Sequence, residues 1–278
     1  MPKFAANITM MFTEMPLLDR IDAAARMGFE AIECSQPYEA DAGEFAARAR
    51  SAGIAVALLN FPAGDWSAGE RGLACHPGRL ADFRASVEAG ISFAKQCGAS
   101  RMNCLAGVVP AGIDDAAARE TLVSNLRHAA AELGNAGMDL LVEPINRYDL
   151  PGYAVAGSSG AIEVLDAVGA PNAFLQYDVY HMQRMEGELA ATLQRLIGRI
   201  GHVQIADTPG RHEPGTGEIN YRFLLPWLDH IGYQGWVGCE YVPKAGTEKG
   251  LAWREEHGVR GARQGSTESR DTVRGCDV

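Results

Sequence analysis

Short runs of apolar and β-branched residues alternate along the chain with segments whose apolar residues recur at helical spacing. Runs of this kind are typical of strands that are buried in a parallel sheet. The predicted strands cover residues 7–12, 29–34, 54–60, 101–105, 140–143, 174–178, 200–205 and 235–241. Pro144 ends the fifth strand directly after Glu143, because proline has no N–H to donate to a neighbouring strand.

Helical segments separate these strands. The first begins at Pro16 and stops at Gly28, which is the usual placement of proline and glycine at helix ends. Further helices are predicted up to Gly53 and over residues 80–96, 114–134, 162–168, 189–197, 223–228 and 251–256. Two long segments, 61–78 and 148–157, interrupt the pattern, and loops of such length usually bind a ligand or cover a site.

Eight strand–helix pairs within about 255 residues predict an α/β fold, a (β/α)8 TIM barrel that forms a single domain over residues 1–258. An open doubly wound sheet is the alternative, but no GxGxxG sequence follows the first predicted strand, which weakens a dinucleotide-binding version. Residues 259–278 are polar and have no apolar periodicity. We expect this tail to be poorly ordered, or to be ordered by a neighbouring subunit if the protein is a homo-oligomer.

The composition, with 47% apolar and 22% charged residues, is that of a soluble globular protein. No apolar stretch reaches the roughly 18 residues that span a membrane, and the N-terminus lacks the apolar core of a signal peptide, so we expect a cytoplasmic location. Six cysteines without a CxxC pair are expected to be reduced thiols. The net charge of −10 argues against a nucleic acid as the partner and is compatible with a metal ion held by carboxylates.

Four consecutive predicted strands end in polar residues, namely Glu143, Asp178, Gln204 and Glu240. In a barrel the C-terminal ends of all strands open on one face, so we expect these side chains to converge there. Carboxylates and an amide oxygen are hard ligands, which suit Mg²⁺ or Mn²⁺ and suit Zn²⁺ less well. A single glutamate at a strand end is more often an ion-pair partner, but four adjacent polar ends favour a metal site.

Histidines and an arginine near these strand ends are further candidates. His181 leaves its strand at the same face, where a hydrogen bond to a substrate oxygen is favoured over a ligand role. Arg211 and His212 lie in a loop rich in proline and glycine, and an ordinary solvated turn is the alternative. His202 points to the same side as Gln204, and core packing is an equal alternative. The remaining histidines are interpreted as structural or surface residues: His76, His128, His230 and His257.

Several segments together resemble the hydroxypyruvate isomerase family, a branch of the xylose isomerase-like barrels. They are LVEPIN (141–146), QYDVYH (176–181), HVQIAD (202–207), GRHEPGTGE (210–218), GCEY (238–241), NFPAGDW (60–66) and GERG (69–72). The resemblance covers nearly the whole chain up to residue 258. The keto-sugar 3-epimerases of the wider superfamily usually carry a histidine where Gln204 stands, which favours the isomerase branch.

The resemblance implies an intramolecular oxidoreductase that interconverts hydroxypyruvate and tartronate semialdehyde (2-hydroxy-3-oxopropanoate). A relative with the same site acts on the four-carbon 2-oxo-tetronate, so the substrate is a small 2-oxo or hydroxy acid. In such a reaction a carboxylate moves a proton between neighbouring carbons, and a divalent metal ion stabilises the enediolate. Glu143 and Glu240 are then both metal ligands and acid–base groups, whereas Asp178 and Gln204 are ligands only.

The substrate itself needs polar contacts on this face. His181 and Arg211 are predicted to hold its oxygens and to offset developing negative charge. Arg71, in the long loop after the third strand, and Lys244, after the eighth strand, are the candidates to bind its carboxylate.

Three other functions remain open. A keto-sugar 3-epimerase is one. A DNA-repair endonuclease with this barrel is another, although it needs several histidines around zinc ions and a basic groove. The third is a barrel that binds small acids without turning them over.

Overall fold

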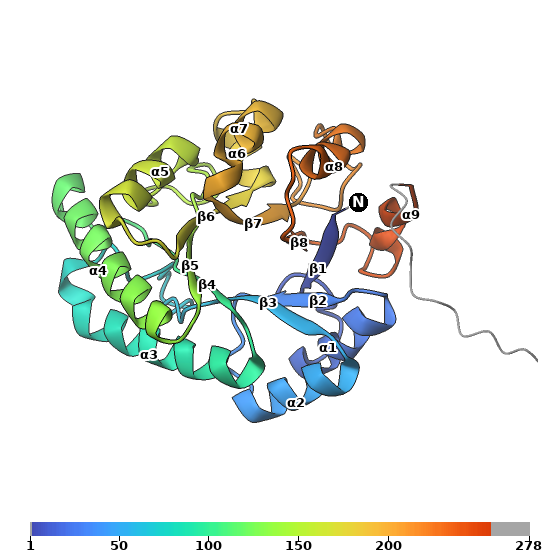
Figure 1. The fold of residues 1–278 in the computed structure, drawn as a ribbon, viewed down its shortest axis with the longest axis horizontal. Helices are drawn as coiled ribbons and strands as arrows, with labels where there is room; N and C mark the ends of the chain where they lie inside the picture. Colours follow the sequence, from blue (N-terminus) through green and yellow to red (C-terminus); the bar gives the residue numbers. More distant parts are fainter. Residues whose placement is uncertain (1, 257–278) are drawn as a thin grey trace, which may run out of the picture.

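The computed structural model describes residues 2–256, so the predicted tail over 259–278 and His257 lie outside the described residues. Within this range parallel strands close into a barrel in the order β1 to β8, and β8 pairs with β1 (Figure 1). The strands are β1 Lys3–Asn7, β2 Ala31–Cys34, β3 Ala55–Asn60, β4 Arg101–Asn103, β5 Asp139–Val142, β6 Ala173–Asp178, β7 Ile200–Ile205 and β8 Trp236–Cys239. The predicted single-domain (β/α)8 TIM barrel is confirmed.

Helices form a ring around the outside of the barrel (Figure 1). They are α1 Leu17–Arg26, α2 Ala42–Ala52, α3 Leu80–Cys97, α4 Asp115–Asn135, α5 Gly157–Val168, α6 Val179–Met185, α7 Leu189–Leu196, α8 Tyr221–His230 and α9 Trp253–Glu256, with the 3-10 turns η1 Pro77–Arg79, η2 Ile197–Arg199 and η3 Lys249–Leu251. Asp41 and Asp114 cap α2 and α4, because each side chain accepts a backbone N–H from the first helical turn. The predicted helix ends at Gly53 and at residue 168 are confirmed, and Gly169 caps the second of these helices.

The first strand lies earlier in the chain than predicted. β1 ends at Asn7, and most of residues 8–12 lie in turns and bends instead of the predicted strand. The interior of β1 includes two alanines, Ala5 and Ala6. Ala5 packs against alanines of β2 and β3, and alanine is depleted in strands, so it gives no strand signal in the sequence. Ile8, Met11 and Phe12 of segment 8–12 are buried after the strand has ended. Their pattern therefore indicated burial and not a strand.

A helix that the sequence analysis did not predict, α6, follows β6 without a loop. Asp178 is the last residue of β6 and also caps α6, because its Oδ1 accepts the backbone N–H of Tyr180 at 2.8 Å. His181 therefore lies in the first turn of a helix, which fixes its position relative to Asp178. The helix has only 7 residues, too few to give a clear apolar period.

Among residues 2–256, no helix combines the length and the apolar composition that crossing a bilayer requires. The cysteines of this range, Cys34, Cys75, Cys97, Cys104 and Cys239, are free thiols, as predicted.

Candidate active site

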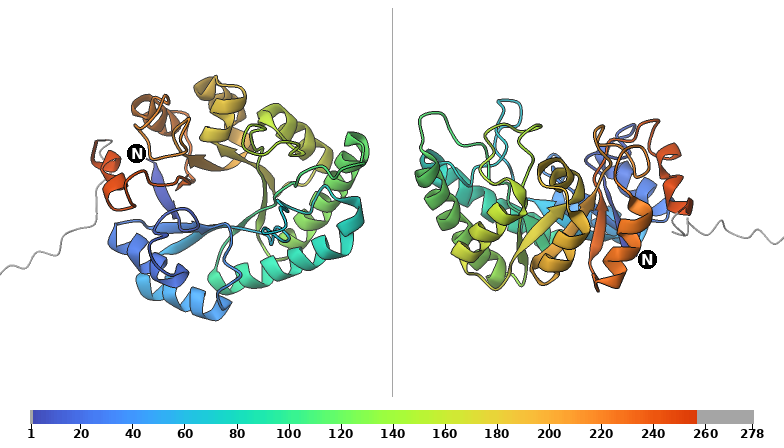
Figure 2. Two further views of the ribbon diagram at one scale, coloured as in Figure 1. Left: turned by 180° about the vertical axis from the view of Figure 1, so that it is seen from behind. Right: turned by 90° about the horizontal axis from the view of Figure 1, so that it is seen from above.

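The structure brings the four polar strand-end residues to one end of the barrel. Asp178 ends β6, Gln204 lies opposite it in β7, and Glu143 and Glu240 directly follow β5 and β8. None of these side chains belongs to a residue more than 8% exposed. Long loops project at one end of the barrel in the right-hand view of Figure 2. The consecutive order of β5 to β8 around the barrel is what makes the four residues neighbours.

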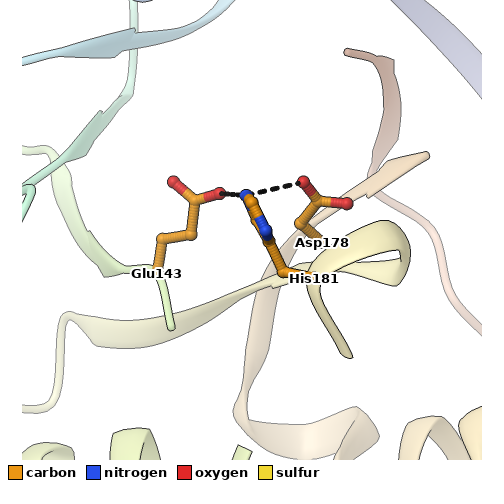
Figure 3. A group of neighbouring side chains, drawn as sticks. All are labelled: Glu143, Asp178 and His181. Carbon is orange, nitrogen blue, oxygen red and sulfur yellow. Dashed lines mark ion pairs between the residues drawn. The ribbon is translucent and has the colours of Figure 1, made fainter. Parts of the chain in front are cut away.

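Glu143, Asp178 and His181 point toward one another (Figure 3). The Nε2 atom of His181 lies 3.8 Å from Glu143 Oε1 and 3.5 Å from Asp178 Oδ2. One potential ligand atom of each residue lies within 4.8 Å of the others, and this is the one such group of histidine, cysteine and acidic residues within 2–256. Two carboxylates at this spacing suit a hard divalent cation.

Arg211 connects Asp178 with a third carboxylate of the cluster, that of Glu240. Its Nη2 atom donates to Glu240 Oε2 at 2.6 Å and lies 3.5 Å from Asp178 Oδ2. Its guanidinium also lies over the ring of Tyr180, 5.1 Å from the ring centroid. Glu240 and Asp178 are therefore linked through a single cationic side chain, which reaches the cluster from the loop after β7.

Burial makes the ionised carboxylates of this cluster costly. It raises the pKa of Glu143 well above its usual value, and the neighbouring Glu240 and Asp178 raise it further. Burial also raises the pKa of Asp178 to about 6 and that of Glu240 to about 8, although Arg211 acts in the opposite direction on both. Arg211 supplies one positive charge against three carboxylates, so a divalent cation fits the remaining charge.

His181 is neutral in this surrounding. Its burial lowers its pKa well below the usual value, and the positive charges of Arg211 and Arg184 lower it further. A neutral imidazole has one nitrogen that donates a hydrogen bond and one that accepts. The chemistry of His181 in the cluster therefore depends on which nitrogen carries the proton.

A buried polar network lies inside the barrel next to Gln204. Gln204 donates from Nε2 to Glu33 Oε2 at 2.8 Å and accepts at Oε1 from Gln176 Nε2 at 2.6 Å. Glu33 also pairs with His202, and Asn7 Nδ2 bridges Glu33 Oε2 at 3.2 Å and Glu240 Oε1 at 3.1 Å. The network holds the amide of Gln204 with its oxygen away from Glu33. An amide oxygen accepts two interactions, so Oε1 retains the capacity for the predicted ligand role.

The loop that carries Arg211 is organised by Asp207. Its Oδ2 accepts the backbone N–H groups of Gly215 and Gly217, both at 2.9 Å, and its Oδ1 accepts that of Ile219 at 3.1 Å. A Cβ at position 217 would lie 2.0 Å from the backbone carbonyl oxygen of Thr208, so only glycine fits there. These contacts hold Arg211 at the cluster even though it lies in a loop.

A cavity of about 400 Å³ opens beside the cluster. Its lining comprises Thr9, Met10, Ser35, Gln36, Asn60, Trp66, Arg71, Leu105, Glu143, Ile145, Asp149, Leu150, His181, Arg211 and Glu240. A larger groove of about 1030 Å³ lies on the outer surface between α3 and α4 and contains none of the cluster residues. Because carboxylates with raised pKa values meet in the smaller cavity, it is the candidate substrate site.

The two candidates for binding a substrate carboxylate differ in position. Arg71 lines the cavity, and its guanidinium stacks on Trp66 at 3.8 Å from the ring centroid while donating to the carbonyl oxygen of Trp66 at 2.9 Å. Lys244 is exposed and is not part of the cavity lining. The structure thus brings Arg71 to the site and leaves Lys244 outside the cavity.

Several polar residues at the site were not singled out in the sequence. Glu33, Asn103 and Gln176 lie within β2, β4 and β6. Asn103 donates to Glu143 Oε2 at 2.9 Å, so it belongs to the cluster. Asp149 lines the cavity from the loop after β5. The available signal was a charged or amide side chain inside an otherwise apolar strand, which is costly unless it is paired.

His202, for which core packing and a site role were both open, lies fully buried beside Glu33 and does not line the cavity. Its effect on the cluster is therefore exerted through Glu33.

Comparison with known proteins gives consistent results. A sequence model of the family described as "Xylose isomerase-like TIM barrel" matches residues 21–257. The chain is 47% identical to a hydroxypyruvate isomerase of Escherichia coli, with 92% of this chain and 100% of the relative covered. It is also 47% identical to a 2-oxo-tetronate isomerase of Cupriavidus necator, with 91% and 97% covered.

Solved structures agree with the fold. A Brucella melitensis protein described as an AP endonuclease of family 2 superposes with a TM-score of 0.90 at 41% identity, over 92% of this chain and 99% of that chain. A D-allulose 3-epimerase from Methylomonas sp. gives a TM-score of 0.71 at 22% identity, over 90% and 89% of the two chains. The likeness to the epimerase concerns the fold alone.

Proposed function

Because the chain belongs to the hydroxypyruvate isomerase family of xylose isomerase-like TIM barrels and is therefore an isomerase, we propose that it interconverts hydroxypyruvate and tartronate semialdehyde with the help of a divalent cation. The observation that carries the proposal is the cluster of buried carboxylates with Arg211 and His181 at the wall of the cavity. The donor types fit Mg²⁺ or Mn²⁺, for which Glu143, Asp178, Gln204 and Glu240 are the proposed ligands.

The reaction moves one proton between neighbouring carbons. A carboxylate removes the proton from C3 of hydroxypyruvate, which leaves an enediolate over C2 and C3, and the same or the opposite carboxylate returns a proton to C2. The hydroxyl proton moves from O3 to O2, so atoms and charge balance. A divalent cation, when bound, lowers the energy of negative charge on the two oxygens. Glu143 and Glu240 line the cavity from the ends of β5 and β8, and we propose them as the two acid–base groups.

The remaining residues position the substrate. His181 and Arg211 line the cavity and are proposed to donate hydrogen bonds to the oxygens on which charge develops. Arg71 is proposed to bind the substrate carboxylate, because it is the cationic side chain on the wall formed by the loop after β3. Its stacking on Trp66 holds the guanidinium at the edge of the cavity.

Replacement of the two glutamates tests the proposal. Glu143→Gln and Glu240→Gln keep the shape of the side chain and remove its basicity, so each should lower kcat at least about a hundredfold. Glu163→Gln is the matched control, since Glu163 is an exposed residue of α5, and it should turn over like the wild type. EDTA should stop the reaction, and Mg²⁺ or Mn²⁺ should restore it. Near-wild-type turnover in both cluster variants would overturn the assignment.

A four-carbon substrate is the second candidate, because the relatives named for hydroxypyruvate and for 2-oxo-tetronate are equally similar, at 47% identity. Comparison of kcat/KM on the two acids decides between them.

C3 epimerisation of ketohexoses without isomerisation of either acid would favour an epimerase. Specific DNA binding at low salt would favour an endonuclease, which the net charge of −10 disfavours. Absence of metal-dependent proton exchange from every acid would indicate binding without turnover.

A further inference from the structure

Asn146 lies behind His181, on the side away from the carboxylates. It comes three residues after Glu143, at the start of the loop after β5, and it is fully buried. Its Nδ2 atom lies 2.7 Å from His181 Nδ1. At this distance a hydrogen bond joins the amide and the imidazole. The distance alone does not tell whether the amide NH₂ group donates to Nδ1 or whether Nδ1–H donates to the amide oxygen of a reversed side chain.

The other contacts of Asn146 decide which way its amide points. Oδ1 accepts the backbone N–H of Tyr148 at 3.1 Å and that of Asp149 at 2.9 Å. Nδ2 donates to the carboxylate oxygen Asp149 Oδ2 at 2.9 Å. The reversed amide would place an NH₂ group against two backbone donors and an oxygen against a carboxylate. The observed orientation satisfies every partner, so the atom that faces His181 is the NH₂ group.

The carboxylate of Asp149 is itself held in place. Asp149 Oδ2 accepts the hydroxyl of Tyr180 at 2.8 Å, and Arg184 lies 3.4 Å from Oδ1. Tyr180 and Arg184 belong to α6, the helix that also carries His181. The loop after β5 and the helix after β6 therefore fix the donor on Asn146 from both sides.

From this geometry we infer that Asn146 is a positioning residue that keeps the proton of His181 on Nε2. Because Asn146 donates to Nδ1, that nitrogen carries the lone pair and Nε2 carries the hydrogen. Nε2 is the atom that faces the cluster, 3.8 Å from Glu143 Oε1 and 3.5 Å from Asp178 Oδ2 (Figure 3).

This proton position separates two roles that proximity alone leaves open. The spacing of Glu143, Asp178 and His181 would also suit three metal ligands. A nitrogen that carries a hydrogen has no lone pair for a metal, but it donates a hydrogen bond to an oxygen in the cavity. His181 is therefore a donor to the substrate and not a ligand. Its part in turnover rests on the proposed function, whereas the position of its proton does not.

Nitrogen NMR of protein with ¹⁵N-labelled histidine tests this inference directly. The His181 signals are assigned by their loss in His181→Gln. We expect a protonated Nε2 and an unprotonated Nδ1 in the wild type, both without metal and after addition of Mg²⁺. In Asn146→Asp a carboxylate oxygen faces Nδ1, so the proton of the neutral imidazole should move from Nε2 to Nδ1. A wild type with the proton on Nδ1, loss of the Nε2 proton on Mg²⁺ addition, or an Asn146→Asp spectrum like the wild type would overturn the inference.

Asn172→Asp is the matched control for general damage. Asn172 donates from Nδ2 to the carbonyl oxygens of Ala130 and Met138, at 2.9 and 3.0 Å, far from the cluster in the fold. This variant should melt at a lower temperature and keep the wild-type His181 signals. A change of the His181 signals in Asn172→Asp would show that they report general destabilisation, which would also overturn the inference.

Turnover measurements keep the two hypotheses apart. Asn146→Asp should lower kcat on whichever acid the protein isomerises by at least about tenfold, because a donor at the developing charge is lost. If neither acid is turned over but the NMR pattern is as expected, the proposed function fails and the role of Asn146 stands. If both acids are turned over and the proton lies on Nδ1, the role of Asn146 fails and the proposed function stands.

Discussion

Gly238 of β8 faces the buried carboxylate of Glu33, and we predict that Gly238→Ala disturbs both folding and the cluster. A Cβ at position 238 would lie 1.8 Å from Glu33 Oε1 and 2.4 Å from its Cδ. Glu33 is 1% exposed and is held by His202, Gln204 and Asn7 from different sides. The added methyl group would overlap this carboxylate, so it must displace the carboxylate from its partners or shift β8.

The expected size of the effect follows from these contacts. An added methyl group in a packed interior costs about 1–3 kcal/mol. For a domain of this size each kcal/mol lowers Tm by about 2–4 °C, so Tm should fall by about 2–12 °C. Displacement of Glu33 also removes the carboxylate oxygen to which Gln204 Nε2 donates. Asn7, which donates to both Glu33 and Glu240, loses one of its two acceptors. Loss of such outer contacts typically weakens metal binding about 10–100-fold.

Thermal melts followed by circular dichroism and calorimetric titration with Mn²⁺ measure the two effects. Gly160→Ala is the matched control, because an added Cβ at this position of α5 would meet no atom within 4 Å. Alanine is favoured over glycine in a helix by about 1 kcal/mol, so this control should melt slightly above the wild type. If Gly238→Ala melts like the wild type and binds Mn²⁺ equally well, Glu33 is not held as described and the reasoning is refuted.

Two further predictions concern the cavity and its charge. Arg71→Gln should raise KM for the acid substrate about tenfold or more with a smaller change in kcat. Lys244→Gln should leave both constants unchanged, because of these two residues only Arg71 lines the cavity. Steady-state kinetics check this, and an effect of Lys244→Gln alone would contradict it. The metal-free protein should lose stability as the pH rises from about 5 to about 8. Asp178 and Glu240, with pKa values of about 6 and about 8, bind protons in the folded state that the unfolded chain has released. Melts in EDTA at several pH values test this, and stability that increases with pH would refute it.

The sequence by itself determined the barrel and the residues at its strand ends. Most strands and most helices are encoded locally, by apolar runs, by caps such as Asp114, and by breaks such as Pro144 after Glu143, whereas β1 is not. Parallel strands in a barrel expose all their C-terminal ends on one face, so consecutive strands with polar ends must form a common cluster. Glu143, Asp178, Gln204 and Glu240 therefore follow from local pattern plus one topological rule.

Contacts across the closed barrel were decided only by the tertiary structure. Glu33 and His202 lie 169 residues apart, on strands β2 and β7 that do not pair with each other, and they meet because the barrel closes. Alternation along a strand tells which face a side chain occupies, but it does not identify the partner across the interior.

The choice between Arg71 and Lys244 likewise depended on the paths of two loops, and neither path is encoded by a regular pattern. The proton position of His181 depended on the orientation of the Asn146 amide, which two backbone N–H groups of a folded loop determine. Local patterns fix which residues stand at the ends of the strands. The hydrogen-bond partners of these residues, which determine their chemistry, come within reach only when the chain has folded.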